Sequence, residues 1–167
     1  MSTEARDDHG RLRPILLAGA AAGALDITAA FATWVPKGVS PVRLLQGIAS
    51  GLLGAESFRG GAATAALGLA FQFLIATATA AAFFMASRKL PALTRRPLAF
   101  GALYGIAVYL VMYWIVMPLS RFHRRPFSWP ATVIAVLTHV FCVGIPIAVV
   151  VGRSRPSLPA RDAVPSA

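Results

Sequence analysis

Charged residues are scarce in this chain, and acidic residues are the scarcest. Only 13% of its 167 residues are charged, and six acids stand against 16 lysines and arginines. Hydrophobic residues make up 57% of the sequence, more than an average soluble domain contains. The composition therefore excludes an ordinary water-soluble globule and indicates a membrane protein.

Cysteine is nearly absent, since Cys142 is the single one. One cysteine forms no intrachain disulfide, and its place inside an apolar stretch is typical of a small buried hydrophobic residue. Enzyme motifs are also missing: there is no H-E-x-x-H zinc pair, no G-x-S-x-G and no phosphate-binding loop. The sequence thus predicts no catalytic residue, no metal site and no cofactor, and it favours a protein that is not an enzyme.

Long apolar stretches are what the chain does contain. Four are long enough to span a membrane, at 14–35, 61–86, 98–118 and 131–152. A helix needs about 20 mostly apolar residues to cross a hydrocarbon core about 30 Å thick. The stretches predict an all-α, four-helix transmembrane bundle over residues 14–152. A signal peptide cleaved near Ala32 is the alternative for the first stretch, but that stretch is long for a signal core and Asp26 interrupts it.

The remaining segments are short. Residues 1–13 and 153–167 are polar or rich in proline, serine and arginine, which predicts flexible cytoplasmic tails. Between the first two stretches, Ser40 followed by Pro41 predicts the start of a short helix over about 41–53. Its leucines and Ile48 share one face, whereas Gln46 and Ser50 lie on the other. This pattern predicts an amphipathic helix in the first outer loop, on the membrane surface or in the mouth of the bundle.

Basic residues gather at the ends of the apolar stretches. Lysine and arginine favour the cytoplasmic side of a membrane. If the N-terminus is inside, ten of the 16 basic residues lie on the cytoplasmic side and six outside, which predicts that both termini are cytoplasmic. Trp34, Trp114 and Trp129 then fall at the outer interface, where indole rings prefer to lie. We expect the basic flanks to contact anionic lipid headgroups rather than a nucleic acid.

Each apolar stretch carries one polar side chain near its middle: Asp26, Gln72, Tyr109 and His139. Counted from the cytoplasmic ends at about 1.5 Å per residue, the four lie within about one helical turn of the same depth. An ionised carboxylate at mid-bilayer costs at least about 2.5 kcal/mol, so Asp26 needs a partner, water or a proton. His139 is the expected partner, either as a structural pair or as a proton-responsive or ligand-binding site.

Small residues lie on the same helical faces as the polar ones. Steps of three and four residues keep side chains on one face of a helix. Close packing through such residues drives helix association in lipid, where the hydrophobic effect does not. The predicted packing positions are Gly19, Gly23, Gly68, Gly101 and Gly105. We also expect Pro146 to kink the fourth helix.

Three functional classes stay open. A structural or partner-binding membrane subunit, forming a homo-oligomer or joining another membrane protein, is favoured because so small a chain has little room for its own translocation path. A proton- or solute-handling transporter component with an intramembrane Asp26 and His139 site is the alternative. A membrane enzyme acting on lipid, with the same two residues as acid and base, is the second alternative.

Three segments carry a resemblance to known proteins: LLQGIASGLLG at 44–54, SRKLP at 87–91 and GALYG at 101–105. In these segments the chain resembles a set of small four-helix proteobacterial inner-membrane proteins that are distantly similar to the YagU-type family. The resemblance covers about residues 14–152 and implies an inner-membrane location without an assigned chemistry. Members tend to carry histidine at the position of Gln72, and this departure argues against a two-histidine metal or proton site in this chain.

Overall fold

The computed structural model describes residues 3–121 and 128–154, with side chains described from Leu12 onward. The described residues form helices and short connections, with no strand among them. Four helices are long and apolar enough to cross a membrane. The prediction of an all-α chain with four such helices is therefore confirmed.

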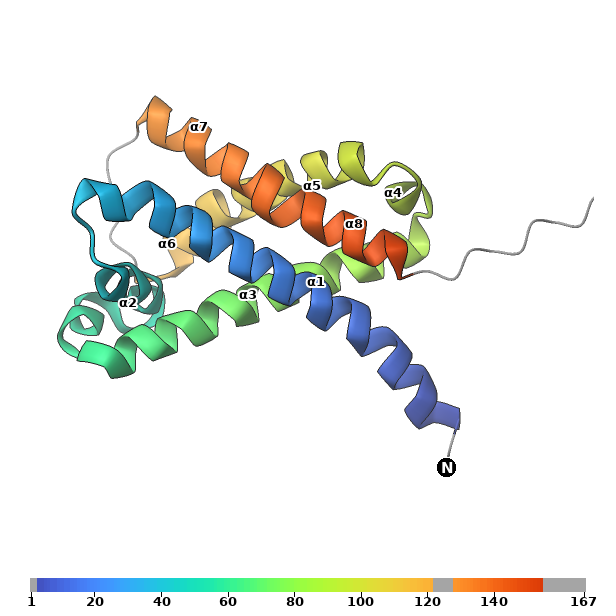
Figure 1. Cartoon of the computed structure of the whole chain (residues 1–167), viewed down its shortest axis with the longest axis horizontal. Helices are drawn as coiled ribbons and strands as arrows, with labels where there is room; N and C mark the ends of the chain where they lie inside the picture. Colours follow the sequence, from blue (N-terminus) through green and yellow to red (C-terminus); the bar gives the residue numbers. More distant parts are fainter. Residues whose placement is uncertain (1–2, 122–127, 155–167) are drawn as a thin grey trace, which may run out of the picture.

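The chain folds into twelve helical segments in the described ranges (Figure 1). The first half contains α1 (Thr3–Trp34), the 3-10 turn η1 (Val35–Lys37), α2 (Pro41–Leu53), the 3-10 turn η2 (Gly54–Arg59), α3 (Gly61–Lys89) and α4 (Ala92–Arg95). The second half contains α5 (Pro97–Val111), the π-helical η3 (Met112–Val116), α6 (Met117–Leu119), α7 (Trp129–Thr138), the π-helical η4 (His139–Gly144) and α8 (Ile145–Arg153).

These segments join into four long helices. Their apolar parts run over Leu12–Lys37, Gly61–Lys89, Pro97–Leu119 and Trp129–Arg153. The third long helix consists of α5, η3 and α6, and the fourth of α7, η4 and α8. Each boundary lies within three residues of the one expected from the sequence.

Helical backbone extends into the segment 1–13, whose predicted flexibility stays a prediction. Helix α1 begins at Thr3, so its backbone continues through that segment. Pro14 lies inside the helix, where the missing N–H would normally end it, and the helix passes through this position. The predicted tail at 153–167 lies almost wholly outside the described residues.

Helix α1 lies between α3 and the fourth long helix, and the fourth long helix packs in turn against α5 (Figure 1). The two ends of this bundle differ. One end, the α4 end, holds α4 and the last turn of α8; the other, the α2 end, holds η1, α2 and η2. The main hydrophobic core lies toward the α4 end. Its buried members are Ala18, Ala22, Ala80, Phe83, Val143, Ile147, Ala148 and Val151.

Helix α2 packs on α3 with its polar side inward. Its N-cap Ser40 accepts a hydrogen bond from the backbone N–H of Arg43 at 3.3 Å. Gln46 is only 5% exposed and donates from Nε2 to the carbonyl of Gly61 at 3.0 Å, whereas Leu52 is 58% exposed. A helix on a water-soluble protein places these faces the other way round.

The far end of α2 is tied to the third long helix. The backbone N–H of Arg121 donates to the carbonyl of Gly51 at 2.9 Å. Gly68 of α3 lies so close to the backbone of Leu45 and Ala49 that a side chain there would overlap them. Helix α2 is thus held in the mouth of the bundle, between α3 and the end of α6.

Candidate functional site

The mid-helix polar residues form two pairs rather than one cluster. Asp26 of α1 and Gln72 of α3 are both half-buried and face each other. Gln72 donates from Nε2 to Oδ2 of Asp26 at 2.7 Å, and the same nitrogen lies 3.5 Å from the carbonyl of Gly23. A bond to a carboxylate at this length is a charge-assisted one if Asp26 is ionised. It links the first and second long helices.

His139 does not pair with Asp26 as the sequence predicted, and it contacts Ala135 and Tyr109 instead. His139 Nδ1 lies 2.8 Å from the carbonyl of Ala135, one turn earlier in the same helix. Because a carbonyl only accepts, Nδ1 is assigned the hydrogen in this contact. The imidazole ring meets the ring of Tyr109 edge to face, with centroids 5.7 Å apart and planes at 74°. Equal depth along the helices did not determine which polar groups face each other.

Aromatic rings continue from this second pair toward the α2 end. Tyr109 stacks on Tyr113 at 5.8 Å between centroids, and Tyr113 meets Trp114 edge to face at 5.4 Å. His139, Tyr109, Tyr113 and Trp114 therefore form a continuous aromatic row, which starts at the contact of the third and fourth long helices and continues along the third. Pairs with such geometry each add about 0.5–1.5 kcal/mol beyond their buried area.

Three glycines bring the third and fourth long helices together. A Cβ at Gly105 would lie 2.6 Å from Cα of Val140, and one at Gly101 would lie 2.8 Å from Cα of Ile145. On the opposing helix, a Cβ at Gly144 would lie 2.7 Å from Cα of Gly105. The two backbones are in direct contact, and this contact places the His139 ring beside Tyr109.

Gly144 is the packing residue that sequence reasoning missed. It lies five residues after His139, which in an α-helix is a different face. The segment from His139 to Gly144 is π-helical, and a π turn closes over five residues instead of four. The wider turn brings Gly144 onto the face that α5 contacts.

Each π segment ends two residues before a proline. Met112–Val116 comes before Pro118, and His139–Gly144 comes before Pro146. A proline inside a helix removes one backbone donor and clashes with the carbonyl four residues earlier. Local π geometry is one way that helices accommodate this. The two prolines were therefore a sequence signal for the π turns, although only a kink at Pro146 was expected from the sequence.

The other predicted glycines contact α3 or belong to it. A Cβ at Gly19 would lie 2.6 Å from the backbone of Thr77, and one at Gly23 would lie 2.8 Å from the ring of Phe73. Gly68 contacts α2 rather than another long helix. The close approach at Gly19 and Gly23 sets the distance across which Gln72 reaches Asp26.

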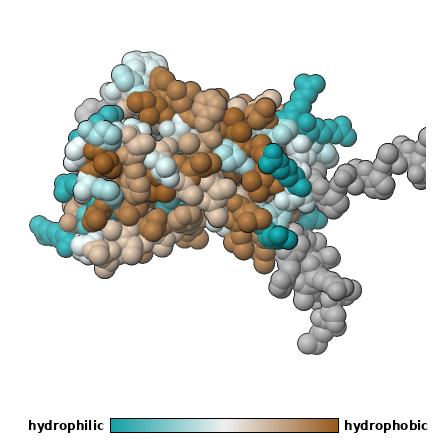
Figure 2. All heavy atoms as spheres, viewed as in Figure 1, coloured by the Kyte–Doolittle hydropathy of each residue, from teal (hydrophilic) through white to brown (hydrophobic). Residues whose placement is uncertain are grey.

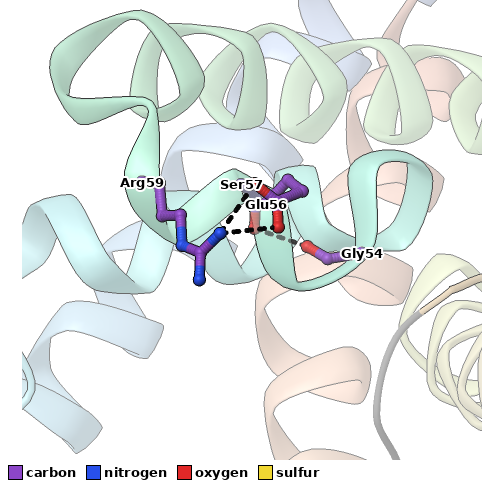
Figure 3. Close-up of polar contacts among 4 residues, drawn as sticks. All are labelled: Gly54, Glu56, Ser57 and Arg59. Atoms are coloured by element: carbon purple, nitrogen blue, oxygen red, sulfur yellow. Dashed lines mark hydrogen bonds and ion pairs between the residues drawn. The ribbon is translucent and has the colours of Figure 1, made fainter.

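The polar groups at the α2 end form a separate local set. Arg59 donates to Glu56 at 3.1 Å, the one ion pair among the described side chains, and the buried Ser57 hydroxyl donates to the carbonyl of Gly54 at 2.9 Å (Figure 3). Both charged side chains of the pair are strongly exposed, so the pair contributes little to stability.

The three tryptophans lie in the half of the bundle nearer the α2 end. Lys37 lies over the ring of Trp34 with its Nζ 4.7 Å from the centroid. Trp114 and Trp129 are mostly exposed, on the third and fourth long helices. An exposed indole at this position is suited to a membrane interface.

The described residues hold no cluster of three histidine, cysteine or acidic side chains that could bind a metal ion. Cys142 is half-buried in η4. No buried side-chain nitrogen or oxygen among the described residues lacks a hydrogen-bond partner. The bond from Gln72 to Asp26 joins two long helices, whereas His139 bonds within its own helix.

Comparison of the chain with protein-family models, with curated proteins and with solved structures gives no match. The proposed function therefore rests on the residues and contacts of this chain.

Proposed function

We propose that this chain is a multi-pass protein of a bacterial inner membrane, with both termini in the cytoplasm. The four long helices are compatible with this, and the surface between the two bundle ends is largely hydrophobic (Figure 2). Many of the exposed residues on that surface are large and apolar, among them Leu74, Leu103 and Phe141. The described basic side chains lie at the two ends, and the α4 end holds more of them. By the positive-inside rule, the α4 end faces the cytoplasm.

Cysteine labelling tests this orientation. In a Cys142→Ser background, Lys37→Cys at the α2 end should react with a membrane-impermeant maleimide in intact spheroplasts. Lys89→Cys at the α4 end should react only after lysis, because the membrane shields it. Both lysines are exposed, so they are matched controls for each other. Labelling of Lys89→Cys in intact spheroplasts would show that the α4 end faces outward, contrary to the proposal.

We further propose that the protein acts as a structural or partner-binding subunit in that membrane. The observation that carries this is the bond from Gln72 to Asp26, which joins α1 to α3. The carboxylate, the most costly group to place in a bilayer, is used to connect two helices. An enzyme acting on lipid would need Asp26 and His139 to work together as acid and base, and the two side chains have separate partners.

A proton- or solute-handling role is the second candidate. It is favoured by the π segment at His139–Gly144, because π turns in helices occur frequently at functional sites.

Proton flux into reconstituted vesicles separates the two candidates. Vesicles that contain wild-type protein, a pH-sensitive dye and an imposed potential should acidify no faster than protein-free vesicles. The Asp26→Asn variant, which keeps an oxygen that accepts from Gln72, should give the same rate. A wild-type flux that Asp26→Asn abolishes while its fold is retained would instead establish the transport role.

A further inference from the structure

The α4 end of the bundle carries a dense group of cations. Arg13, Arg88, Lys89, Arg95, Arg96 and Arg153 are all exposed there. The described acidic side chains are Asp26, in the middle of α1, and Glu56, at the opposite end. No described carboxylate therefore neutralises this group, and hydrophilic side chains project from that end of the molecule (Figure 2).

The connection that carries four of these cations is a fixed structure. Helix α3 ends with a bond from the N–H of Leu90 to the carbonyl of Ala86 at 2.9 Å, and α4 follows at once. Leu93 of α4 packs under the connection against the hydrophobic core. Thr94 donates from its hydroxyl to the carbonyl of Pro91 at 3.1 Å. With the inner side of α4 packed in this way, Arg95 at its end and Arg96, the next residue, are exposed.

Two open hollows lie along this connection, each with a pair of adjacent cations. The hollow at the joint of α4 and α5 has a volume of about 270 Å³ and is lined by Ala92, Arg95, Arg96 and Phe100. The other has a volume of about 660 Å³ and is lined by Met85, Ala86, Arg88 and Lys89. In both hollows, arginine side chains lie beside apolar lining residues.

We propose that the hollow at Arg95 and Arg96 is a binding site for the phosphate of an anionic phospholipid. Arginine binds phosphate oxygens through paired N–H donors, and Phe100, which lines the same hollow, offers an apolar surface to the first acyl carbons. Arg88 and Lys89 at the neighbouring hollow raise the local positive potential. The site rests on the membrane location proposed above, because the end of α3 and the start of α5 then lie at headgroup depth.

Lipid retention measured by native mass spectrometry tests the site. Full-length protein in mild detergent would be titrated with phosphatidylglycerol, with phosphatidylcholine and with inorganic phosphate. Each basic residue near an anionic lipid contributes about a factor of five, so Arg95→Gln with Arg96→Gln should weaken phosphatidylglycerol binding about 25-fold. The double variant Lys37→Gln with Arg43→Gln removes two exposed cations from the opposite end and should leave this binding unchanged.

Three outcomes would overturn the proposal. The first is an equal loss of phosphatidylglycerol binding in both double variants, which would show that binding depends only on the net charge of the protein. The second is equal retention of phosphatidylcholine and phosphatidylglycerol, which would remove the preference for an anionic headgroup. The third is full competition by inorganic phosphate at millimolar concentration, which would make a free phosphate the ligand. If the cysteine labelling gives the expected orientation while the arginine variants bind normally, only the lipid site fails and the proposed location stands.

Discussion

Gly144→Ala is expected to destabilise the bundle by about 2 kcal/mol, the scale of overpacking in a well-packed core. The added methyl group would lie 2.7 Å from Cα of Gly105 and would overlap the carbonyl of Gly101. These neighbours are backbone atoms, which cannot rotate away as a side chain does. The two helices must separate, and the row from His139 to Trp114 should loosen with them. Unfolding of the purified protein in detergent, followed by circular dichroism, measures the loss.

Gly47→Ala is the matched control, because it adds the same methyl group at a helical glycine. Nothing lies within 4 Å of a Cβ at Gly47. Alanine is favoured over glycine inside a helix by up to about 1 kcal/mol, so this variant should be neutral or more stable than wild type. The direct contact between the third and fourth long helices would be refuted by a Gly144→Ala protein as stable as Gly47→Ala.

Gln72→Leu is expected to be among the most damaging changes to a polar residue in this chain. It removes the amide that donates to Asp26 at 2.7 Å and leaves the carboxylate between α1 and α3 without that donor. An unpaired acid at mid-bilayer costs about 2.5 kcal/mol or more, or else takes up a proton. Asp26→Asn should cost much less, because the asparagine carbonyl oxygen still accepts from Gln72.

The double variant Asp26→Leu with Gln72→Leu decides the cause of that loss. Removing both partners leaves no orphaned polar group, so the pair of changes should be less destabilising than Gln72→Leu alone. Wild type, the two single variants Asp26→Leu and Gln72→Leu, the double variant and Asp26→Asn would be compared by the same unfolding measurement in lipid nanodiscs. If the double variant is simply the sum of two costly single changes, Asp26 is solvated by water, and the helix-joining role assigned to this bond is wrong.

Helix positions were within reach of sequence reasoning because hydropathy and local signals determine them. Membrane-length apolar runs gave the four long helices, and Ser40 with Pro41 gave the start of α2, which has the expected bounds Pro41–Leu53. The sequence did not determine which face of α2 turns inward. Its amphipathic pattern did not reveal that Gln46 turns inward, because that depends on the carbonyl of Gly61, on the neighbouring helix α3, which accepts from Gln46.

The sequence also did not determine the partners of the polar residues, because the four mid-helix polar residues lie on different helices. Depth counted along each helix placed Asp26 and His139 together, yet depth does not state which helices are neighbours or how each is rotated. Helix α1 lies between α3 and the fourth long helix, and its Asp26 meets Gln72 on the α3 side. The π turn at His139–Gly144 places these two residues on one face. Steps of three and four residues, which assume an α-helix, do not predict this.

The sequence by itself determined that this chain is helical, apolar and divided into four membrane-length segments, because burial of backbone polar groups and hydropathy act over short stretches. Only the tertiary structure decided which side chains meet. Glycine contacts such as those at Gly19 and Gly105 set which helices approach and how closely, and these contacts join residues far apart in the chain. The pairing of Asp26 with Gln72 follows from that approach.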